Sequence, residues 1–294
     1  MKNFFSVWLI LITATTSAQH TVDSSAFKLF NRGYRSYESG NLDSALSAWT
    51  EIVEKQIGKE YDVYGYAFFN IPAIYWQMKQ VDKAKEWYRK VLASDLRDND
   101  ETGELMEPHT NYKYKSSIAL ARLSLLDSNY AAVLQWLDSA ETAHPYWGYE
   151  GSATNVSKEQ AFRTGWKTDV LLKLGRKEEA IHLILTELIC AGRLESFFKR
   201  SEDVLLTLID KKAFRADLDA ALDGLTLQSS DSSHWTAFFT LHGLRYTIPI
   251  SKVYPDRELP HYWRIYFINT DQVVDQSSVV HYIRQRQFYQ RLSE

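Results

Sequence analysis

Four segments of the chain share one spacing of apolar residues. In each, a small or β-branched residue is followed four positions later by a large apolar one, in the pairs Ala45/Trp49, Ala84/Tyr88, Val133/Leu137 and Ala180/Ile184. Four positions place both members on one face of an α-helix, where the smaller residue lets a preceding helix approach and the larger one fills the gap. The pattern predicts four helical hairpins within residues 26–192.

The residues around these pairs resemble the tetratricopeptide repeat (TPR) family, and specifically its exported bacterial type. Its consensus has small residues, an aromatic residue and a proline at fixed places in a repeat of about 34 residues. Counted from Ala26, the first repeat matches with Gly33, Gly40, Ala45 and Trp49. Counted from Tyr114, the third matches with Ala121, Ala140 and Pro145. The second and fourth repeats match less well. The resemblance implies a mainly α fold, a TPR-like α-solenoid of about four hairpins.

The repeats are longer than the family's period. The first residues of the four pairs lie 39, 49 and 47 positions apart. Because the turn signals within the repeats are intact, the extra residues belong between one repeat and the next. They predict two inserts, at 96–111 and 144–160, which are rich in Gly, Pro, Asp, Asn and Thr.

After residue 192 the pattern changes twice. Helical periodicity continues over 194–209 and 213–225, which predicts additional or capping helices. From Ser229 onward β-branched and aromatic residues dominate, with strands over 235–241 and 244–250, a His242-Gly243 turn and an alternating segment over 262–268. This favours a small antiparallel sheet, followed by a helix over 279–292. The predicted domains are a signal peptide (1–18), the solenoid (19–192), capping helices (193–228) and a β-rich C-terminal region (229–294).

The amino terminus has the pattern of a secretory signal peptide. A positive start is followed by an apolar run over 4–12 and by small residues that end at Ala18. Nine residues extend only about 14 Å as a helix, about half of a bilayer core. No cysteine follows Ala18 to accept a lipid, and no later apolar run is long enough to span a membrane. We expect a periplasmic or secreted protein without a lipid anchor or transmembrane segment.

Composition limits the chemistry. With 34 Lys and Arg against 37 Asp and Glu in 294 residues, the chain has no global basic field for nucleic acid. Its single cysteine, Cys190, excludes an intrachain disulfide, and the eight histidines show no zinc-site spacing. The acidic segment that begins at Asp98 resembles a calcium loop, but its twelfth position is His109 instead of a carboxylate. We therefore expect no catalytic motif, no metal and no cofactor.

Aromatic residues mark a candidate binding surface. In TPR proteins, positions 2, 5, 9 and 12 of the first helix of a repeat line the concave groove that receives a peptide. The resemblance assigns these positions in the first two repeats to Phe27, Phe30, Tyr34, Tyr37, Tyr66, Phe69, Ala73 and Trp76. Aromatic side chains supply a large contact area at a low entropic cost. Two readings stay open: an external partner binds these residues, or the C-terminal sheet or a second copy of the chain packs on them.

The third repeat replaces the aromatic stripe. Lys115 and Arg122 occupy two of its groove positions, which predicts a basic end to the aromatic groove.

Two classes of function follow. The first is a non-catalytic exported scaffold that binds a protein or peptide, with homo-oligomerisation left open. The second is an enzyme or glycan-processing protein whose site lies in the C-terminal region, where His242, Asp256, Glu258 and His261 stand near aromatic strands. An enclosed pocket with a carboxyl of raised pKa in that region would favour the second.

The signal-peptide assignment makes the first testable prediction. When the full chain is produced in a bacterium with its native amino terminus, cleavage after Ala18 should leave Gln19 as the first residue, because small residues precede that bond. Amino-terminal sequencing of the exported product measures this directly. Recovery of a product that still begins at Met1 would contradict the assignment.

Overall fold

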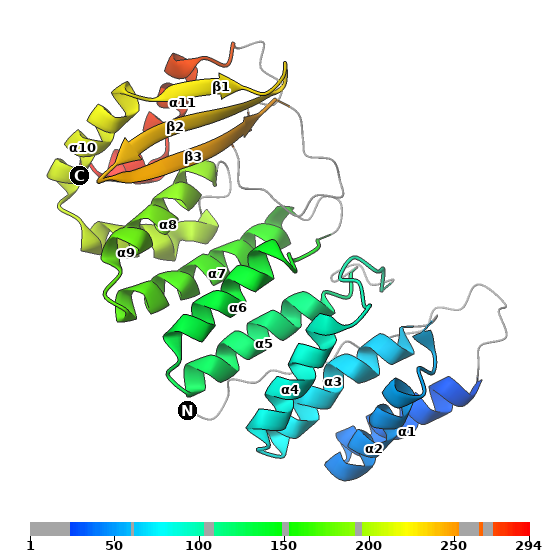
Figure 1. The fold of residues 1–294 in the computed structure, drawn as a ribbon. Helices are drawn as coiled ribbons and strands as arrows, with labels where there is room; N and C mark the ends of the chain where they lie inside the picture. The colour runs from blue at the N-terminus through cyan, green and yellow to red at the C-terminus, as the bar shows by residue number, and fades with distance from the viewer. Residues whose placement is uncertain are drawn as a thin grey trace. The chain divides into compact units, whose positions relative to one another are not determined.

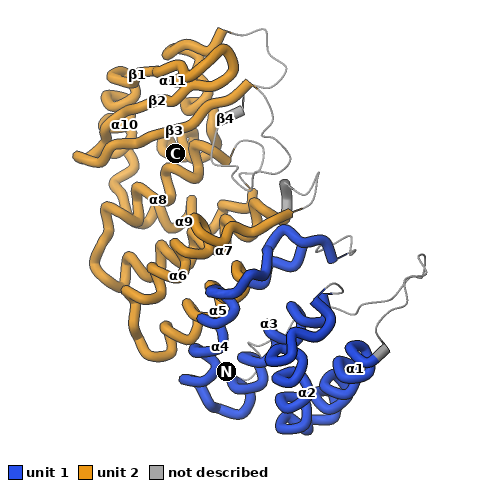
Figure 2. The backbone as a smooth tube through the Cα atoms, turned by 45° about the vertical axis from the view of Figure 1, so that its right-hand side comes forward, with its two compact units in different colours: residues 1–112 blue, residues 113–294 orange. Residues whose placement is uncertain are grey.

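The computed structural model describes residues 24–59, 62–102, 109–148, 153–191, 196–252, 265–266 and 273–294. Its elements run from ten consecutive helices to a small sheet and two short helices (Figure 1). The chain forms two compact units, one that ends at Tyr112 and one that begins at Lys113 (Figure 2). The predicted signal peptide lies outside the described residues.

The first unit contains two helical hairpins, drawn in blue in Figure 2. They are formed by α1 (Ser24–Glu38) with α2 (Leu42–Glu54) and by α3 (Val63–Gln77) with α4 (Val81–Ala93). Helix α2 packs against both α1 and α3, and α1 also contacts α3. The two hairpins therefore stack as neighbouring repeats.

Gly33 shows why a small residue is needed within the first repeat. Trp49 of α2 is 1% exposed and lies against α1 at this point. A Cβ atom added to Gly33 would lie 2.5 Å from Cδ1 of the Trp49 indole, well inside van der Waals contact. The hairpin can close only because this position carries no side chain.

The second unit continues with three hairpins and is orange in Figure 2. They pair α5 (Tyr112–Leu126) with α6 (Tyr130–Thr142), α7 (Ala153–Lys173) with α8 (Lys177–Cys190), and α9 (Lys199–Leu208) with α10 (Lys211–Asp223). The last pair corresponds to the predicted capping helices. Helix α7 corrects the second predicted insert, because residues 153–160 form its first turns instead of a loop. Val156, Ser157 and Gln160 are buried there, so tertiary packing overrides a local composition typical of loops.

The four predicted hairpin joints have one geometry. Two residues before each second helix begins, the backbone is left-handed, with φ of 77° at Gly40, 61° at Lys79, 55° at Ser128 and 71° at Gly175. The next amide in each joint donates to the carbonyl five residues earlier, as Asn41 N does to Ser36 O at 2.8 Å. This is the Schellman arrangement that ends a helix and satisfies its last carbonyls. The joints confirm the predicted repeat register, including its unequal spacing.

The C-terminal region is a four-stranded sheet with two short helices. Strands β1 (Thr226–Ser229), β2 (His234–Leu241) and β3 (Leu244–Ser251) are antiparallel, and His242-Gly243 forms the predicted turn. Strand β4 (Ile265–Tyr266) adds a parallel edge to β3, so the sheet is mixed where the sequence predicted antiparallel pairing alone. The predicted final helix is two helices, α11 (Gln276–Arg284) and α12 (Gln287–Arg291).

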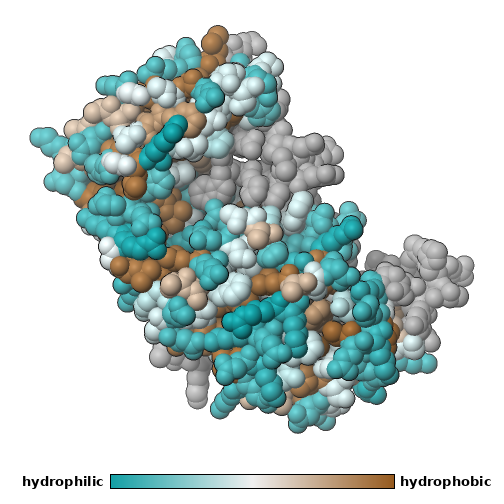
Figure 3. Space-filling model, in the orientation of Figure 1, coloured by the Kyte–Doolittle hydropathy of each residue, from teal (hydrophilic) through white to brown (hydrophobic). Residues whose placement is uncertain are grey.

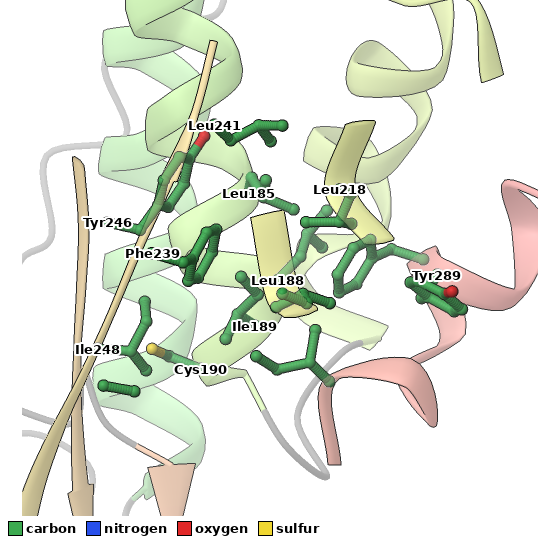
Figure 4. Close-up of a cluster of buried hydrophobic side chains, with 14 of the residues drawn as sticks. Leu185, Leu188, Ile189, Cys190, Leu218, Phe239, Leu241, Tyr246, Ile248 and Tyr289 are labelled. Carbon is green, nitrogen blue, oxygen red and sulfur yellow. The ribbon is translucent and has the colours of Figure 1, made fainter. Parts of the chain in front are cut away.

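One face of this sheet packs on helices of the same unit. Alternate residues of β2 and β3 are buried, among them Phe239, Tyr246 and Ile248, while Thr240, Arg245 and Thr247 between them are exposed. Figure 4 shows the buried side chains converging with Leu185, Leu188 and Ile189 of α8, and with side chains of α10 and α12. The second unit thus joins helices and strands in one apolar core.

The predicted fold class is confirmed: a mainly α chain of TPR-like helical hairpins with a capping pair and a small β-containing C-terminal region. The described residues of the first predicted insert, 96–102 and 109–111, lie between α4 and α5 outside any helix, and Asp98 and Asn111 are buried, with Asn111 N donating to Asp98 O at 3.1 Å. Among the helices that the structure describes, none combines the length and hydropathy needed to cross a membrane.

The joint geometry predicts opposite effects for two kinds of substitution. Replacing Lys79 or Ser128 with glycine should raise the free energy of unfolding by about 0.5–1 kcal/mol, because glycine adopts a left-handed backbone without strain. Replacing Gly40 or Gly175 with alanine should lower it by about 1 kcal/mol. An added Cβ would meet nothing within 4 Å at either glycine, so the alanine variants isolate the backbone effect. Urea unfolding measures all four, and destabilisation of both glycine variants would contradict the assignment.

Candidate functional site

The predicted aromatic residues of the first unit occupy one face of each of two helices. On α1, the positions 27, 30, 34 and 37 recur at helical spacing, and on α3 the positions 66, 69, 73 and 76 do the same. We call these eight residues the aromatic face. Seven of the eight carry aromatic rings, and Ala73 is the exception.

Direct contacts join the two halves of the aromatic face. The rings of Phe30 and Tyr66 meet edge to face, with centroids 5.0 Å apart. Toward the carboxyl ends of both helices, the side-chain amide of Gln77 on α3 donates to the hydroxyl of Tyr37 on α1. The first contact joins the earlier residues, Phe30 of α1 and Tyr66 of α3, and the second joins the later residues, Tyr37 of α1 and Gln77 of α3. The two helices therefore lie side by side in the same direction.

The members of the aromatic face differ in how much surface they present. Tyr66 is 8% exposed and belongs to the core of the first unit, and burial raises the pKa of its hydroxyl to about 12. Phe69 stacks on Tyr112, with centroids 5.2 Å apart. Phe27, Phe30, Tyr34, Tyr37 and Trp76 are half-buried. Tyr66 thus contributes mainly to packing, and the half-buried aromatic members keep part of each ring at the surface.

The polar groups along the aromatic face are uncharged amides and hydroxyls, with one acidic neighbour. Asn31 and Gln77 are exposed, and Asn70 donates through Nδ2 to the Tyr66 carbonyl at 2.8 Å. Burial, and secondarily the Glu38 carboxylate, raises the pKa of Tyr34. Arg32 instead reaches Glu51 of α2, with Nη2 3.4 Å from Oε2. The face therefore offers hydrogen bonds and aromatic surface with little charge.

Lys115 and Arg122 lie on α5 in the second unit. Arg122 is exposed, Lys115 is half-buried, and Ile118 between them is 7% exposed in a core cluster of that unit. The basic end that the sequence assigns to the aromatic groove stays a prediction.

The second unit contains a cluster of polar side chains, most of them buried, that the sequence pattern did not predict. Lys167 of α7 pairs with Asp138 of α6, with Nζ 2.6 Å from Oδ1, and also with Glu141. One turn earlier on α7, Arg163 donates to the Tyr114 hydroxyl, which itself donates to Glu159 at 2.6 Å. Polar residues at helical spacing on α7 were the available signal, but their burial depends on contacts between helices.

Glu187 of α8 is the most deeply buried acid of this cluster. It is 1% exposed and accepts a hydrogen bond from Thr164, while its Oε2 has no partner among the described residues. Burial raises the pKa of its carboxyl well above the ordinary value, although Thr164, Arg163 and Lys167 oppose the shift. A raised carboxyl pKa is common at catalytic sites. Glu187 lines neither the hollow beside His242 nor the one beside Asp275.

The C-terminal candidates are only partly described. His242 lies between two acids, with Nε2 3.0 Å from Asp217 Oδ2 and Nδ1 3.8 Å from Glu178 Oε2. These three residues line an open hollow with Lys177 and Phe214. Asp256, Glu258 and His261 lie outside the described residues. Within the described ranges, no group of three His, Cys, Asp or Glu side chains is arranged to hold a metal ion.

The distribution of hydrophobic side chains on the surface does not single out one binding site. Hydrophilic side chains cover much of the face that Figure 3 shows, and hydrophobic ones gather in several separate areas. Cys190, the single cysteine, is buried, and its burial raises the pKa of the thiol to about 12, which disfavours the reactive thiolate.

Comparison with known proteins finds structural likeness alone. No protein-family model matches the chain, and no curated protein matches its sequence. Similar solved structures include a kinesin light chain candidate from Podosopora anserina with nearly identical TPR-like repeats, with 16% identity, a TM-score of 0.41, and coverage of 70% of this chain and 94% of that one. A sequence variant of the same protein gives 15% identity, a TM-score of 0.40, and coverage of 68% and 92%. Likeness at this level carries no argument about what the chain binds.

Glu187 generates a prediction about pH. An acid whose pKa is raised by folding stabilises the native state below its unfolded pKa and loses that contribution as pH rises toward the folded pKa. The free energy of unfolding of the second unit should therefore fall above about pH 4.5, by up to about 1.4 kcal/mol per pH unit from this group. Glu187→Gln should remove that slope and stabilise the protein at pH 7.

Urea unfolding at a series of pH values measures the slope. Glu178→Gln is the matched control, because Glu178 lies on the same helix with an exposed side chain. If Glu187→Gln lowers the free energy of unfolding at pH 7 and keeps its dependence on pH, the native protein carries this carboxyl in its charged form and the prediction is wrong.

Proposed function

We propose that this protein is a non-catalytic exported scaffold that binds an extended protein segment on the aromatic face of α1 and α3. The observation that carries the proposal is the set of half-buried rings, Phe27, Tyr34, Tyr37 and Trp76, on two helices joined by the Phe30–Tyr66 and Gln77–Tyr37 contacts. Export rests on the signal-peptide pattern over residues 1–18.

Rings held in this way are suited to binding. A side chain that is already packed on one side loses little rotamer entropy when a partner covers its other side. Tyr37 is fixed by Gln77 and by the Trp49 ring, whose centroid lies 5.8 Å away. Aromatic anchors of this kind dominate the energetics of protein interfaces. The prearranged geometry therefore supports capture of a ligand without a large rearrangement.

An enzyme with its site near His242 is the second candidate, favoured by the histidine that lies between Asp217 and Glu178. The side chains of the two acids are 57% and 58% exposed. Water competes with a substrate for groups exposed to this degree, and an open hollow does not strengthen their electrostatic effect. The aromatic face has the stronger physical argument.

Selection from a random peptide library against the purified chain tests the proposal. Peptides enriched on the wild-type protein should lose at least about 2 kcal/mol of binding free energy, roughly 30-fold in Kd, when Tyr34 and Trp76 are both replaced by alanine. Isothermal titration calorimetry with individual enriched peptides gives the numbers.

Tyr75→Ala is the matched control. Tyr75 is a half-buried aromatic residue of the same helix, but it stacks on Trp87 of α4, with centroids 6.3 Å apart, instead of facing α1. Its variant should keep binding. Equal losses in the control and in the double variant, or a selection that enriches no peptide, would refute the aromatic face as the binding surface.

A further inference from the structure

We propose that the hollow beside His242 holds the side chain of a lysine or arginine from a partner protein. The hollow lies in the second unit and shares no residue with the aromatic face, so the inference goes beyond the proposed function. It rests on three features of the hollow: the connections that form it, its apolar floor, and an acid at its rim that accepts no hydrogen bond from the described part of the chain.

Three connections of the second unit meet at this hollow. Its lining includes Lys177 and Glu178 at the start of α8, Asp210 in the α9–α10 connection, and His242 in the β2–β3 turn. Surface connections carry binding residues more often than the elements they join. The sheet, α8, α9 and α10 contribute to one apolar core, which holds the three connections in place relative to one another. The hollow is therefore built by the fold of the unit rather than by a single loop.

The floor of the hollow is apolar. Ile181 and Phe214 are buried and line it, together with the half-buried side chains of Leu208 and Ile209. The hollow has a volume of about 180 Å³. Pockets for drug-sized ligands are larger, about 300–1,000 Å³. The size therefore suits one side chain, and the floor suits a row of methylene groups.

The rim of the hollow is acidic. Glu178, Asp210 and Asp217 line it with a single lysine, Lys177. His242 Nε2 lies 3.0 Å from Asp217 Oδ2, within hydrogen-bond distance, whereas its Nδ1 lies 3.8 Å from Glu178 Oε2, which is too far. A neutral imidazole carries one N–H and can serve only one of these two acids. Glu178 accepts no hydrogen bond from the residues that the structure describes, so it can receive a donor from outside.

A long cationic side chain matches both the floor and the rim. Lysine and arginine have aliphatic stems that lie along apolar surface while the charged end stays in water. In this hollow the stem covers Ile181 and Phe214, and the charged end donates to Glu178. Because the acid is exposed, its charge contributes only a small part of the affinity and mainly selects a ligand of opposite sign. An anionic side chain of the same length is repelled.

Four small molecules of similar length test this selection. The probes n-butylammonium and n-propylguanidinium are the side chains of lysine and arginine, and 1-butanol and butyrate are their neutral and anionic counterparts. The full chain is labelled at the isoleucine methyl groups, because Ile181 and Ile209 line the hollow, and Ile71 and Ile74 of the first unit serve as internal references. Titrations followed by NMR should shift the first pair saturably. The cations should bind roughly two- to fivefold more tightly than 1-butanol, the range that exposed ion pairs give, and butyrate should bind most weakly.

Two variants locate the site, each with a matched control. Ala213→Leu should abolish binding of all probes, because Ala213 is an exposed residue that lines the hollow and a larger side chain fills it. Ala220→Leu makes the same change on an exposed residue of α10 that does not line the hollow, and it should bind as wild type does. Glu178→Gln should remove the preference for cations and keep the affinity for 1-butanol.

The control for the charge change is Glu54→Gln, an exposed glutamate of the first unit, which should keep the preference. About 1 M NaCl should reduce the advantage of the cations, because salt screens exposed charges. A short Gly/Ser peptide, blocked at both ends and carrying one central lysine, should shift the same methyl groups. If the free amines bind and this peptide does not, the occupant is a small amine instead of a protein side chain, and the inference is wrong.

Other results also overturn the inference. Equal affinity for cation, alcohol and carboxylate, or an unchanged preference for cations in Glu178→Gln, would show that the acid does not select the ligand. Cation binding that survives in Ala213→Leu would place the site elsewhere. If no probe shifts Ile181 or Ile209, the hollow is not a binding site. None of these results bears on the aromatic face, which the Tyr34 and Trp76 variants test separately.

Discussion

The close approach of Trp49 to Gly33 is the contact on which the first unit depends. The buried indole of α2 lies where any side chain at Gly33 would overlap it, so the Trp49 ring packs directly on the backbone of α1. The same indole meets Tyr37 of α1 at 5.8 Å and Tyr66 of α3 at 6.1 Å. One side chain therefore fixes the mutual positions of three helices and of two members of the aromatic face. Its Nε1 has no hydrogen-bond partner among the described residues, a cost that the packing of the large ring offsets.

Helix α8 has a similar organising position in the second unit. Leu185, Leu188 and Ile189 pack toward the sheet, while Glu187 turns toward the polar cluster of α7. A helix that is buried on opposite sides cannot show a simple amphipathic pattern, because neither side faces water. The apolar side supplies most of the cohesion. The polar side demands a specific alignment of α7 and α8, since a shift would leave Glu187 buried without Thr164.

The sequence predicted the features that depend on local spacing. The four joints follow from residues four positions apart and from turn residues beside them, and helical geometry is set within that distance. Lys79 and Ser128 show the limit even here, because nothing in their identity indicates a left-handed backbone. The joint imposes that conformation once both helices have formed.

Features that depend on distant segments were missed or mistaken. The first turns of α7 contain loop-forming residues, yet Val156 and Gln160 are buried and held in a helix by their neighbours. The parallel pairing of β4 with β3 joins segments about 15 residues apart, and the sequence carries no signal for that register. The burial of the acids and bases around Glu187 likewise depends on which helices meet.

The aromatic face shows why residue type alone does not separate packing from binding. Tyr34 and Tyr66 both belong to the predicted binding stripe, but Tyr66 has Phe30 on one side and Trp49 on the other. Its ring is already enclosed, so it stabilises the repeat and orients its neighbours. Tyr34 and Trp76 are half-buried and keep part of each ring at the surface. The stacking of repeats thus both builds the aromatic face and decides which of its rings keep exposed surface.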